Sequence, residues 1–421
     1  MGARILTGQA LDDARALIRL IGNSAKDLDA QGVLGEFYWT RFAVGRDAVD
    51  LRRSVTHYSA LYVELPDAVR IEVREFLDQI ESRMDRADEL MDRAAFPGWD
   101  AALDTAIEIL YEVSQLVIDG DPALPTPFTG LAVALERRFN LTRRARPRSP
   151  DLDEAIAAID RAIELSRPDD EQLPMRHTFR IRFLGTKYDQ TDNVSTLEEA
   201  IRNGNQLLVS SEDHPDPATL NSVVAQLYKR RYDRTMAIAD IDTAISHLRE
   251  AMRLSSNDGL ERYAIMDDLG VVLRRRGEHV GDTETLEEAV TLHRRTADAY
   301  PVDHIDWIMV RHNLGRALLA LGGATTDDAL VGQAIEVLRR VVTAGTERSH
   351  PDLAGFQQDL AFALSTRFRV TGDVSALKEQ VGILQEASTG TERRPGAARD
   401  LSSDLGNAMR RLVLQRQFGV S

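Results

Sequence analysis

Apolar and small residues recur along this chain in one five-residue pattern, Leu-x-x-Ala-Ile or a close variant of it. Clear copies occupy residues 103–107, 152–156, 197–201, 241–245 and 286–290, and weaker copies occupy 51–55, 331–335 and 377–381. Successive copies end 44 to 52 residues apart, and five of the seven steps are 44 to 46 residues long. Self-similarity at such a period predicts one structural unit that is repeated about eight times.

Each copy predicts a helix with one buried face, which we term helix B. In the second clear copy the apolar stripe follows the i, i+3, i+4, i+7 spacing of one helix side. It consists of Leu152, Ala155, Ile156, Ile159 and Ile163. The residue before the end of the pattern is small in seven of eight copies, so a close approach to another helix is expected there. These positions hold Ser54, Ala106, Ala155, Ala200, Ala244, Ala289, Ala334 and, as the exception, Gln380.

A second helix, helix A, is predicted before each helix B. The helix A mark is a leucine followed by a small residue, and the leucine lies 21 residues before the last residue of the helix B pattern. The pair appears as Leu34-Gly35, Leu269-Gly270, Leu314-Gly315 and Leu360-Ala361, and Leu405-Gly406 begins one further copy. Turn residues such as Thr371-Gly372-Asp373 separate the two helices. Three linkers place an aspartate two residues after a histidine, and Asp216, Asp306 and Asp352 are expected to cap the next helix.

These elements predict an all-α chain, an α-solenoid of about eight helix-turn-helix repeats with a period of about 45 residues and capping helices at both ends. Residues 1–25 are assigned to an N-terminal capping helix near 8–21, 26–100 to divergent repeats, 101–399 to regular repeats, and 400–421 to a C-terminal capping helix near 400–417. Within 60–100 a long helix rich in Arg, Glu and Asp replaces a standard helix A. The closing helix carries Met409, Leu412, Val413 and Leu414, so it is expected to fold back on the array, or something normally continues there.

The two helix patterns together resemble the tetratricopeptide repeat (TPR), with a longer connection between helix A and helix B. More narrowly, they are similar to the TPR arrays that precede CHAT peptidase domains in actinobacterial and fungal proteins. The segments that carry this likeness are Asn313-Leu314-Gly315, Leu286-Glu287-Glu288-Ala289-Val290, the turn from Arg367-Phe368 to Gly372-Asp373, and the Asp-His-Pro-Asp type linkers. The resemblance covers about residues 26–417. It implies an adaptor role without an active site, because a CHAT peptidase needs a catalytic Cys and the chain has none.

Composition excludes several other functions. The net charge of −15 opposes nucleic-acid and anionic-membrane binding. The absence of cysteine excludes disulfides, thiolate catalysis and Cys-ligated metals. No apolar run reaches the roughly 20 residues of a membrane span, and the N-terminus lacks a secretory signal, so a cytoplasmic location is expected. The strong preference for arginine over lysine indicates a bacterial origin. No motif for a metal, a cofactor or a catalytic residue is present.

A ligand-binding surface is implied on the A helices by the resemblance to TPR proteins, whose concave groove is lined by positions beside the Leu-Gly pair. The corresponding residues vary between repeats and are more basic than the chain as a whole, which favours a protein or peptide with carboxylates. A solvated helix face is the alternative interpretation. The residues are Gln226, Lys229, Arg230, Arg274, Arg275, His312, Arg316, Gln358, Asn407 and Arg410.

Two other features have alternative interpretations. A cation stands just before the end of most A helices, at Arg41, Arg93, Arg138, Lys187, Arg231, Arg276 and Arg367. It is interpreted as a structural partner of helix ends or of acids such as Glu198 and Glu287, and alternatively as a basic ladder for an acidic ligand. Gly204 and His293 interrupt an apolar column of helix B, either as an internal pocket or as a tight crossing and a packed core histidine.

The sequence therefore predicts a scaffold or sensor that binds a protein or peptide and performs no chemistry. A peptide-responsive regulator and an enzyme with a site inside the superhelix are the alternatives. The expected partner is a protein or peptide, acidic in one interpretation, with no nucleic acid, membrane or cofactor involved. Association through the C-terminal helix is a further expectation.

Overall fold

The structure is a computed structural model that describes residues 28–45, 50, 53–54, 82–93, 99–116, 125–142, 149–210, 214–255, 259–391 and 403–413. Every regular element within these ranges is an α-helix, which confirms the all-α prediction. None of the described helices is long and apolar enough to cross a bilayer. The predicted capping helix near 8–21 lies outside the described residues.

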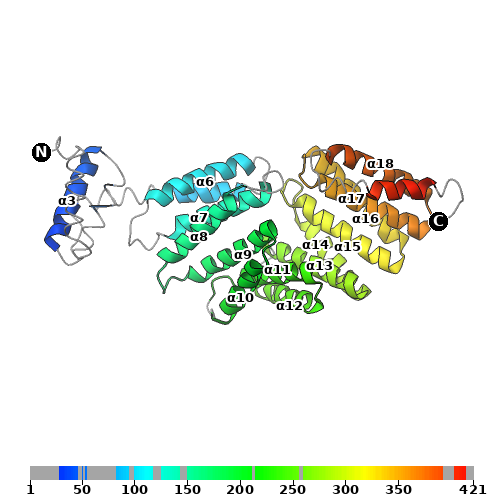
Figure 1. Cartoon of the computed structure of the whole chain (residues 1–421), viewed down its shortest axis with the longest axis horizontal. Helices are drawn as coiled ribbons and strands as arrows, with labels where there is room; N and C mark the ends of the chain where they lie inside the picture. Colours follow the sequence, from blue (N-terminus) through cyan, green and yellow to red (C-terminus); the bar gives the residue numbers. More distant parts are fainter. Residues whose placement is uncertain are drawn as a thin grey trace. The chain divides into compact units, whose positions relative to one another are not determined.

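The described helices divide into two compact units, and the division falls between Phe183 and Leu184 in the sequence. The first unit contains α3 (Leu28–Gly45), a helix at 82–93, α6 (Trp99–Leu116), α7 (Pro125–Thr142), α8 (Asp151–Leu165) and the beginning of α9 (Leu173–Thr191). The second contains the rest of α9, α10 (Val194–Ser210), α11 (Pro217–Thr235), α12 (Ile238–Leu254), α13 (Leu260–Val280), α14 (Thr283–Ala299), α15 (Trp307–Thr325), α16 (Asp328–Glu347), α17 (Leu353–Thr371), α18 (Val374–Thr391) and a helix at 403–413 (Figure 1).

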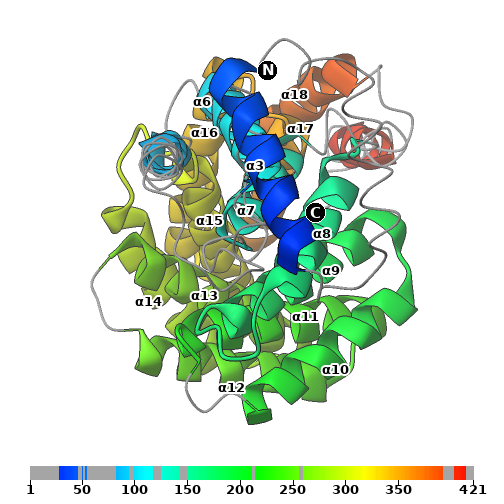
Figure 2. The ribbon, with the colours of Figure 1, turned by 90° about the vertical axis from the view of Figure 1, so that its left-hand side faces the viewer.

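Helix pairs follow one another in a regular order within the second unit. The A helices α13, α15 and α17 each pack on their own helix B and on the helix B of the preceding repeat. Successive A helices also contact each other, α13 with α15 and α15 with α17. Figure 2 shows α13 and α14 side by side from a second direction. These pairs form the TPR-like helical repeat array that the sequence predicts.

The small residue of the helix B pattern is fully buried in each regular repeat. Ala106, Ala155, Ala200, Ala244, Ala289 and Ala334 all have no exposed surface, which confirms the predicted helix phase. In the divergent first repeat, Ser54 occupies this position, and its hydroxyl donates to the carbonyl oxygen of Gly35 at 2.8 Å. The position is therefore small because another helix passes directly over it.

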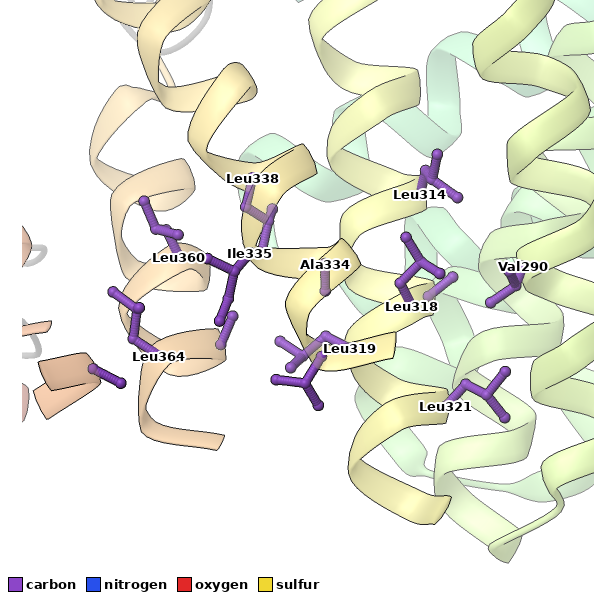
Figure 3. Close-up of a cluster of buried hydrophobic side chains, with 14 of the residues drawn as sticks. Val290, Leu314, Leu318, Leu319, Leu321, Ala334, Ile335, Leu338, Leu360 and Leu364 are labelled. Atoms are coloured by element: carbon purple, nitrogen blue, oxygen red, sulfur yellow. The ribbon is translucent and has the colours of Figure 1, made fainter. Parts of the chain in front are cut away.

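A glycine of helix A faces a large side chain of helix B at the same crossing. A Cβ atom added to Gly315 would lie 2.8 Å from the Leu338 side chain, and one added to Gly322 would lie 2.9 Å from the backbone nitrogen of Val331. Both distances are shorter than real Cβ contacts. Figure 3 shows Leu338 and Ala334 in the core that α15 and α16 share. The Leu-Gly pair of helix A is thus explained by the space that helix B requires.

The linkers differ in part from their predicted capping chemistry. Asp216 caps α11 as predicted, because its carboxylate accepts from the backbone N–H of Thr219 at 2.9 Å. The prediction was wrong for Asp306 and Asp352, whose side chains make no capping hydrogen bond. Both residues have ψ near zero (−4° and 8°), whereas an N-cap residue needs an extended backbone to aim its side chain at the helix.

The linker histidines provide the regular contact instead. In all three linkers Nδ1 of the imidazole accepts the backbone N–H of the aspartate two residues later, at 3.0 to 3.1 Å. The pairs are His214 with Asp216, His304 with Asp306, and His350 with Asp352. These histidines therefore shape the turns between a helix B and the next helix A.

The substitution Ala244→Leu tests the close approach of the helices. Three additional heavy atoms would overpack the crossing and should lower the free energy of unfolding by about 1–3 kcal/mol. Chemical denaturation followed by circular dichroism measures the change. Ala239→Leu is the matched control, because Ala239 is exposed on the same helix and should tolerate leucine. Equal stability of the two variants would contradict the assigned crossing.

Candidate functional site

The cation near the end of helix A joins two neighbouring B helices. The Arg138 guanidinium lies 2.8 Å from Asp151 of its own helix B and 2.9 Å from Asp104 of the preceding one. Arg231 repeats this arrangement with Asp240 and Glu198, and Arg276 repeats it with Asp282 and Asp242. The pairs support the structural interpretation of this column, with Glu198 as one of the expected partners.

The predicted groove residues lie on successive A helices, and their charges are paired with acids of this chain. Arg230 of α11 forms an ion pair with Asp189 of α9 at 2.9 Å. Arg275 of α13 and Lys229 of α11 both contact Asp233, at 2.5 and 3.0 Å. The surface is therefore not the uncompensated basic patch that the residue types alone suggest.

Arg274 differs from the other predicted groove cations because it is buried. Its side chain is only 4% exposed, and its guanidinium lies 2.6 Å from Glu278. Burial and the neighbouring Arg316 guanidinium lower the pKa of Arg274. An incoming ligand therefore cannot reach this side chain without a rearrangement.

A second polar cluster links α15 to α17. His312 is buried, and its Nε2 lies 2.6 Å from a carboxylate oxygen of Asp359. The Arg316 guanidinium lies 3.7 Å from the same carboxylate. Burial alone would raise the pKa of Asp359, but the His312 hydrogen bond and the Arg316 charge outweigh burial, so the pKa lies below its ordinary value. Arg316 is 37% exposed, so it presents a charge to solvent that is only loosely paired.

His293 lies in the core and takes part in a third polar cluster. It has no exposed surface, its ring packs against Gly270, and its Nδ1 lies 2.7 Å from Asp267. The other oxygen of Asp267 accepts from the Asn313 side chain at 2.7 Å, which joins α13 to α15. These contacts favour the packed-histidine interpretation. Gly204 is likewise buried on α10, which is what a tight helix crossing requires.

Asp268 follows Asp267 on α13, and its surroundings disfavour the charged form of its carboxylate. Burial and the adjacent Asp267 charge raise the pKa of Asp268 to about 6, although Gln226 donates a hydrogen bond to it and Lys229 and Arg230 lie near. A group of this kind carries a partial proton near neutral pH. Within the described residues, no group of His, Asp and Glu side chains is arranged to hold a metal ion.

The remaining predicted residues lie farther along the array. Gln358 is partly buried on α17, and Asn407 and Arg410 are exposed on the helix at 403–413. The structure thus joins seven of the predicted residues in small clusters between successive A helices, and it leaves Gln358, Asn407 and Arg410 outside them.

Sequence reasoning missed the acids that pair with the predicted cations, and it missed Phe362. The acids Asp189, Asp233 and Asp359 lie 41 to 47 residues from Arg230, Arg275 and His312. That separation is one repeat, so the period itself could have identified them. Phe362 of α17 is 62% exposed. It directly follows the small residue of the helix A mark, as Arg316 does in α15, and this shared position was the available signal.

No family model and no curated protein matches the chain. Among solved structures, the chain is similar to a putative kinesin light chain with nearly identical TPR-like repeats from Podosopora anserina (19% identity, 52% of this chain and 96% of that one, TM-score 0.37). It is also similar to a tetratricopeptide repeat protein from Parabacteroides merdae (12%, 77% and 99%, 0.37) and to a Rap protein complexed with competence and sporulation factor (11%, 92% and 99%, 0.42).

Two adjacent substitutions test the electrostatics of the third cluster. The folded state raises the pKa of Asp268, so it binds more protons than the unfolded state, and stability falls as pH rises from about 4 to about 6. Asp268→Asn should therefore raise the free energy of unfolding at pH 7 by on the order of 1 kcal/mol and have little effect near pH 4.

Asp267→Asn is the matched control, because the carboxylate of Asp267 accepts from both His293 and Asn313. Removing its charge should destabilise the fold at pH 7. Urea titrations of both variants at pH 4 and pH 7 measure the difference. A destabilising Asp268→Asn at pH 7 would contradict the raised pKa.

Proposed function

We propose that this chain is a scaffold or sensor that binds a protein or peptide on the exposed side of its A helices, centred on α15 and α17. The observation that carries the proposal is Phe362, a large aromatic side chain that is 62% exposed beside a network of ion pairs. Exposed aromatic residues with adjacent arginines are typical of the energetic centres of protein interfaces. The TPR-like fold supports the same function, because such arrays present long surfaces to partners.

The polar network holds the surface in a fixed geometry. Asp359 lies one helical turn before Phe362 on α17, and it is bonded to His312 and near Arg316 of α15. A rigid backbone and pre-paired side chains reduce the entropy that binding costs. The partner that fits best is a segment with an apolar side chain for Phe362 and a carboxylate for Arg316.

The proposal that the partner is acidic rests on Arg316, and not on a positive charge spread over the whole surface. The Arg316 guanidinium lies 3.7 Å from Asp359, so its N–H groups can still donate to a second carboxylate. The more tightly paired Arg230 and Arg275 would have to break ion pairs of 2.9 and 2.5 Å to do so. A regulator that responds to a peptide would use the same surface. The resemblance to arrays beside CHAT peptidases supports an adaptor in the bacterial cytoplasm, without an active site of its own.

Phe362→Ala tests the proposed surface. Affinity capture and mass spectrometry first identify the partner. Biolayer interferometry should then show binding that is about ten-fold weaker or more, because the variant lacks the aromatic side chain that the partner would bury. Tyr111→Ala is the matched control, since Tyr111 of α6 is 59% exposed and lies outside the proposed surface. Equal losses in both variants, or none in Phe362→Ala, would contradict the proposal.

Arg316→Glu tests the charge of the partner. The reversal should weaken binding strongly at low salt and less at high salt, because an exposed charge pair is screened over about 8 Å at physiological ionic strength. Partner binding is measured by biolayer interferometry at low and high salt. Arg340→Glu, measured in the same way, serves as the control, because Arg340 is exposed on α16, a B helix. Identical salt dependence of the two variants would exclude an acidic contact at Arg316.

A further inference from the structure

The helix at 403–413 stands where helix A of one more repeat belongs. Ala408 is buried and packs with Ala361, Leu384 and Ala387 of α17 and α18. Leu412 contacts the neighbouring core, and Arg411 donates to the hydroxyl of Ser365 at 3.0 Å. The helix therefore packs on α17 and α18, as α15 and α17 pack on the helix A and helix B before them.

Its other side is exposed within the described part of the chain, whereas the equivalent sides of α13, α15 and α17 are buried. Met409 is 42% exposed, whereas the residues at the same position, Leu273, Leu318 and Leu364, are 2%, 2% and 1% exposed. Val413 is 50% exposed, whereas its equivalent Phe368 is 8% exposed. Among the residues that the structure describes, no atom lies within 4 Å of a Cβ built on Gly406, although the corresponding spaces at Gly270 and Gly315 are filled.

The earlier repeats show what occupies this side. Leu338 fills the space at Gly315, and Val331 fills the space at Gly322, so residues seven apart on helix A meet residues seven apart on helix B in antiparallel order. His293 and Leu286 meet Gly270 and Gly277 in the same register. The occupant is always an amphipathic helix with two large side chains seven residues apart. An alanine lies three residues after the first of them, at Ala289 and Ala334.

We propose that residues Gly406, Met409 and Val413 form a docking site for an amphipathic helix of this type from a partner protein, with the stripe Leu-x-x-Ala-x-x-x-Leu. The site continues an interface that is already established between helix A and helix B in this chain. This proposal is independent of the surface around Phe362.

A second copy of the chain does not match the site. The helix B stripes of the regular repeats are buried in their own array, with their alanines fully covered. Pairing 403–413 with itself would bring Val413 to Gly406, but it would place Met409 and Arg410 at the crossing where a regular helix B has alanine. Side chains of that size prevent the close approach that the glycine permits. A second copy therefore does not supply the helix B that this site fits.

A helix-stabilised, fluorescein-labelled peptide with the sequence of α16, DALVGQAIEVLRRVVTAGTE, is a suitable probe because it carries Val331, Ala334 and Leu338. Fluorescence anisotropy with the full chain should show saturable binding. Met409→Glu and Gly406→Leu should each weaken binding at least ten-fold, the first by adding a charge and the second by filling the space. The matched control is Val280→Glu, since Val280 of α13 is 48% exposed and outside the site.

Three outcomes would overturn the proposal. The first is no binding of the peptide, and the second is binding that Met409→Glu and Gly406→Leu leave unchanged. The third is a dimer of the free chain that Met409→Glu dissociates in light scattering, because a second copy would then be the occupant. A peptide in which Ala334 is replaced by arginine should fail to bind, and its binding would also count against the proposed register. Circular dichroism of each chain variant verifies that the fold is intact.

Discussion

The close approach of helix A to helix B, at a glycine opposite a large side chain, is the constraint on which the regular repeats depend. At Gly270 and Gly315 the space for a Cβ atom is already occupied by His293 and Leu338. Because the backbones meet at that point, the two helices can pair in only one register. The same register brings the cation near the end of helix A to the first turn of helix B and the acid of the preceding helix B.

Most charges on the A helices serve the contact between repeats. Ion pairs on a protein surface contribute little stability each, with typical values below about 1 kcal/mol, so the hydrophobic core supplies most of the stability. Their main effect is to fix side chains that would otherwise be mobile. Arg230 and Arg275 are held by acids one repeat earlier. Arg316 has a looser pair, and together with the unpaired aromatic surface of Phe362 it distinguishes α15 and α17 from the rest.

The sequence predicted the fold well because the period and the small residues reflect local geometry that recurs in every repeat. The fully buried Ala155 and Ala244 are direct consequences of that pattern. The candidate surface was predicted less well, because exposure depends on neighbours one repeat away. Arg274 is buried for this reason, and Arg230 and Arg275 pair with acids that lie one repeat earlier. The failed caps at Asp306 and Asp352 depend on backbone angles, which residue type does not determine.

The shared register of successive repeats has a consequence for how such a chain changes over generations. Each described helix A in the second unit contacts its own repeat and its immediate neighbours, so no side chain requires a repeat far away in the sequence. Duplication or loss of one whole 45-residue segment would preserve this kind of contact, since α13 and α15 each present a glycine to a large side chain of their helix B. Insertion of a single residue inside a helix would instead rotate the stripe away from that junction. The number of repeats in such an array can therefore vary, whereas the residue spacing within one repeat cannot.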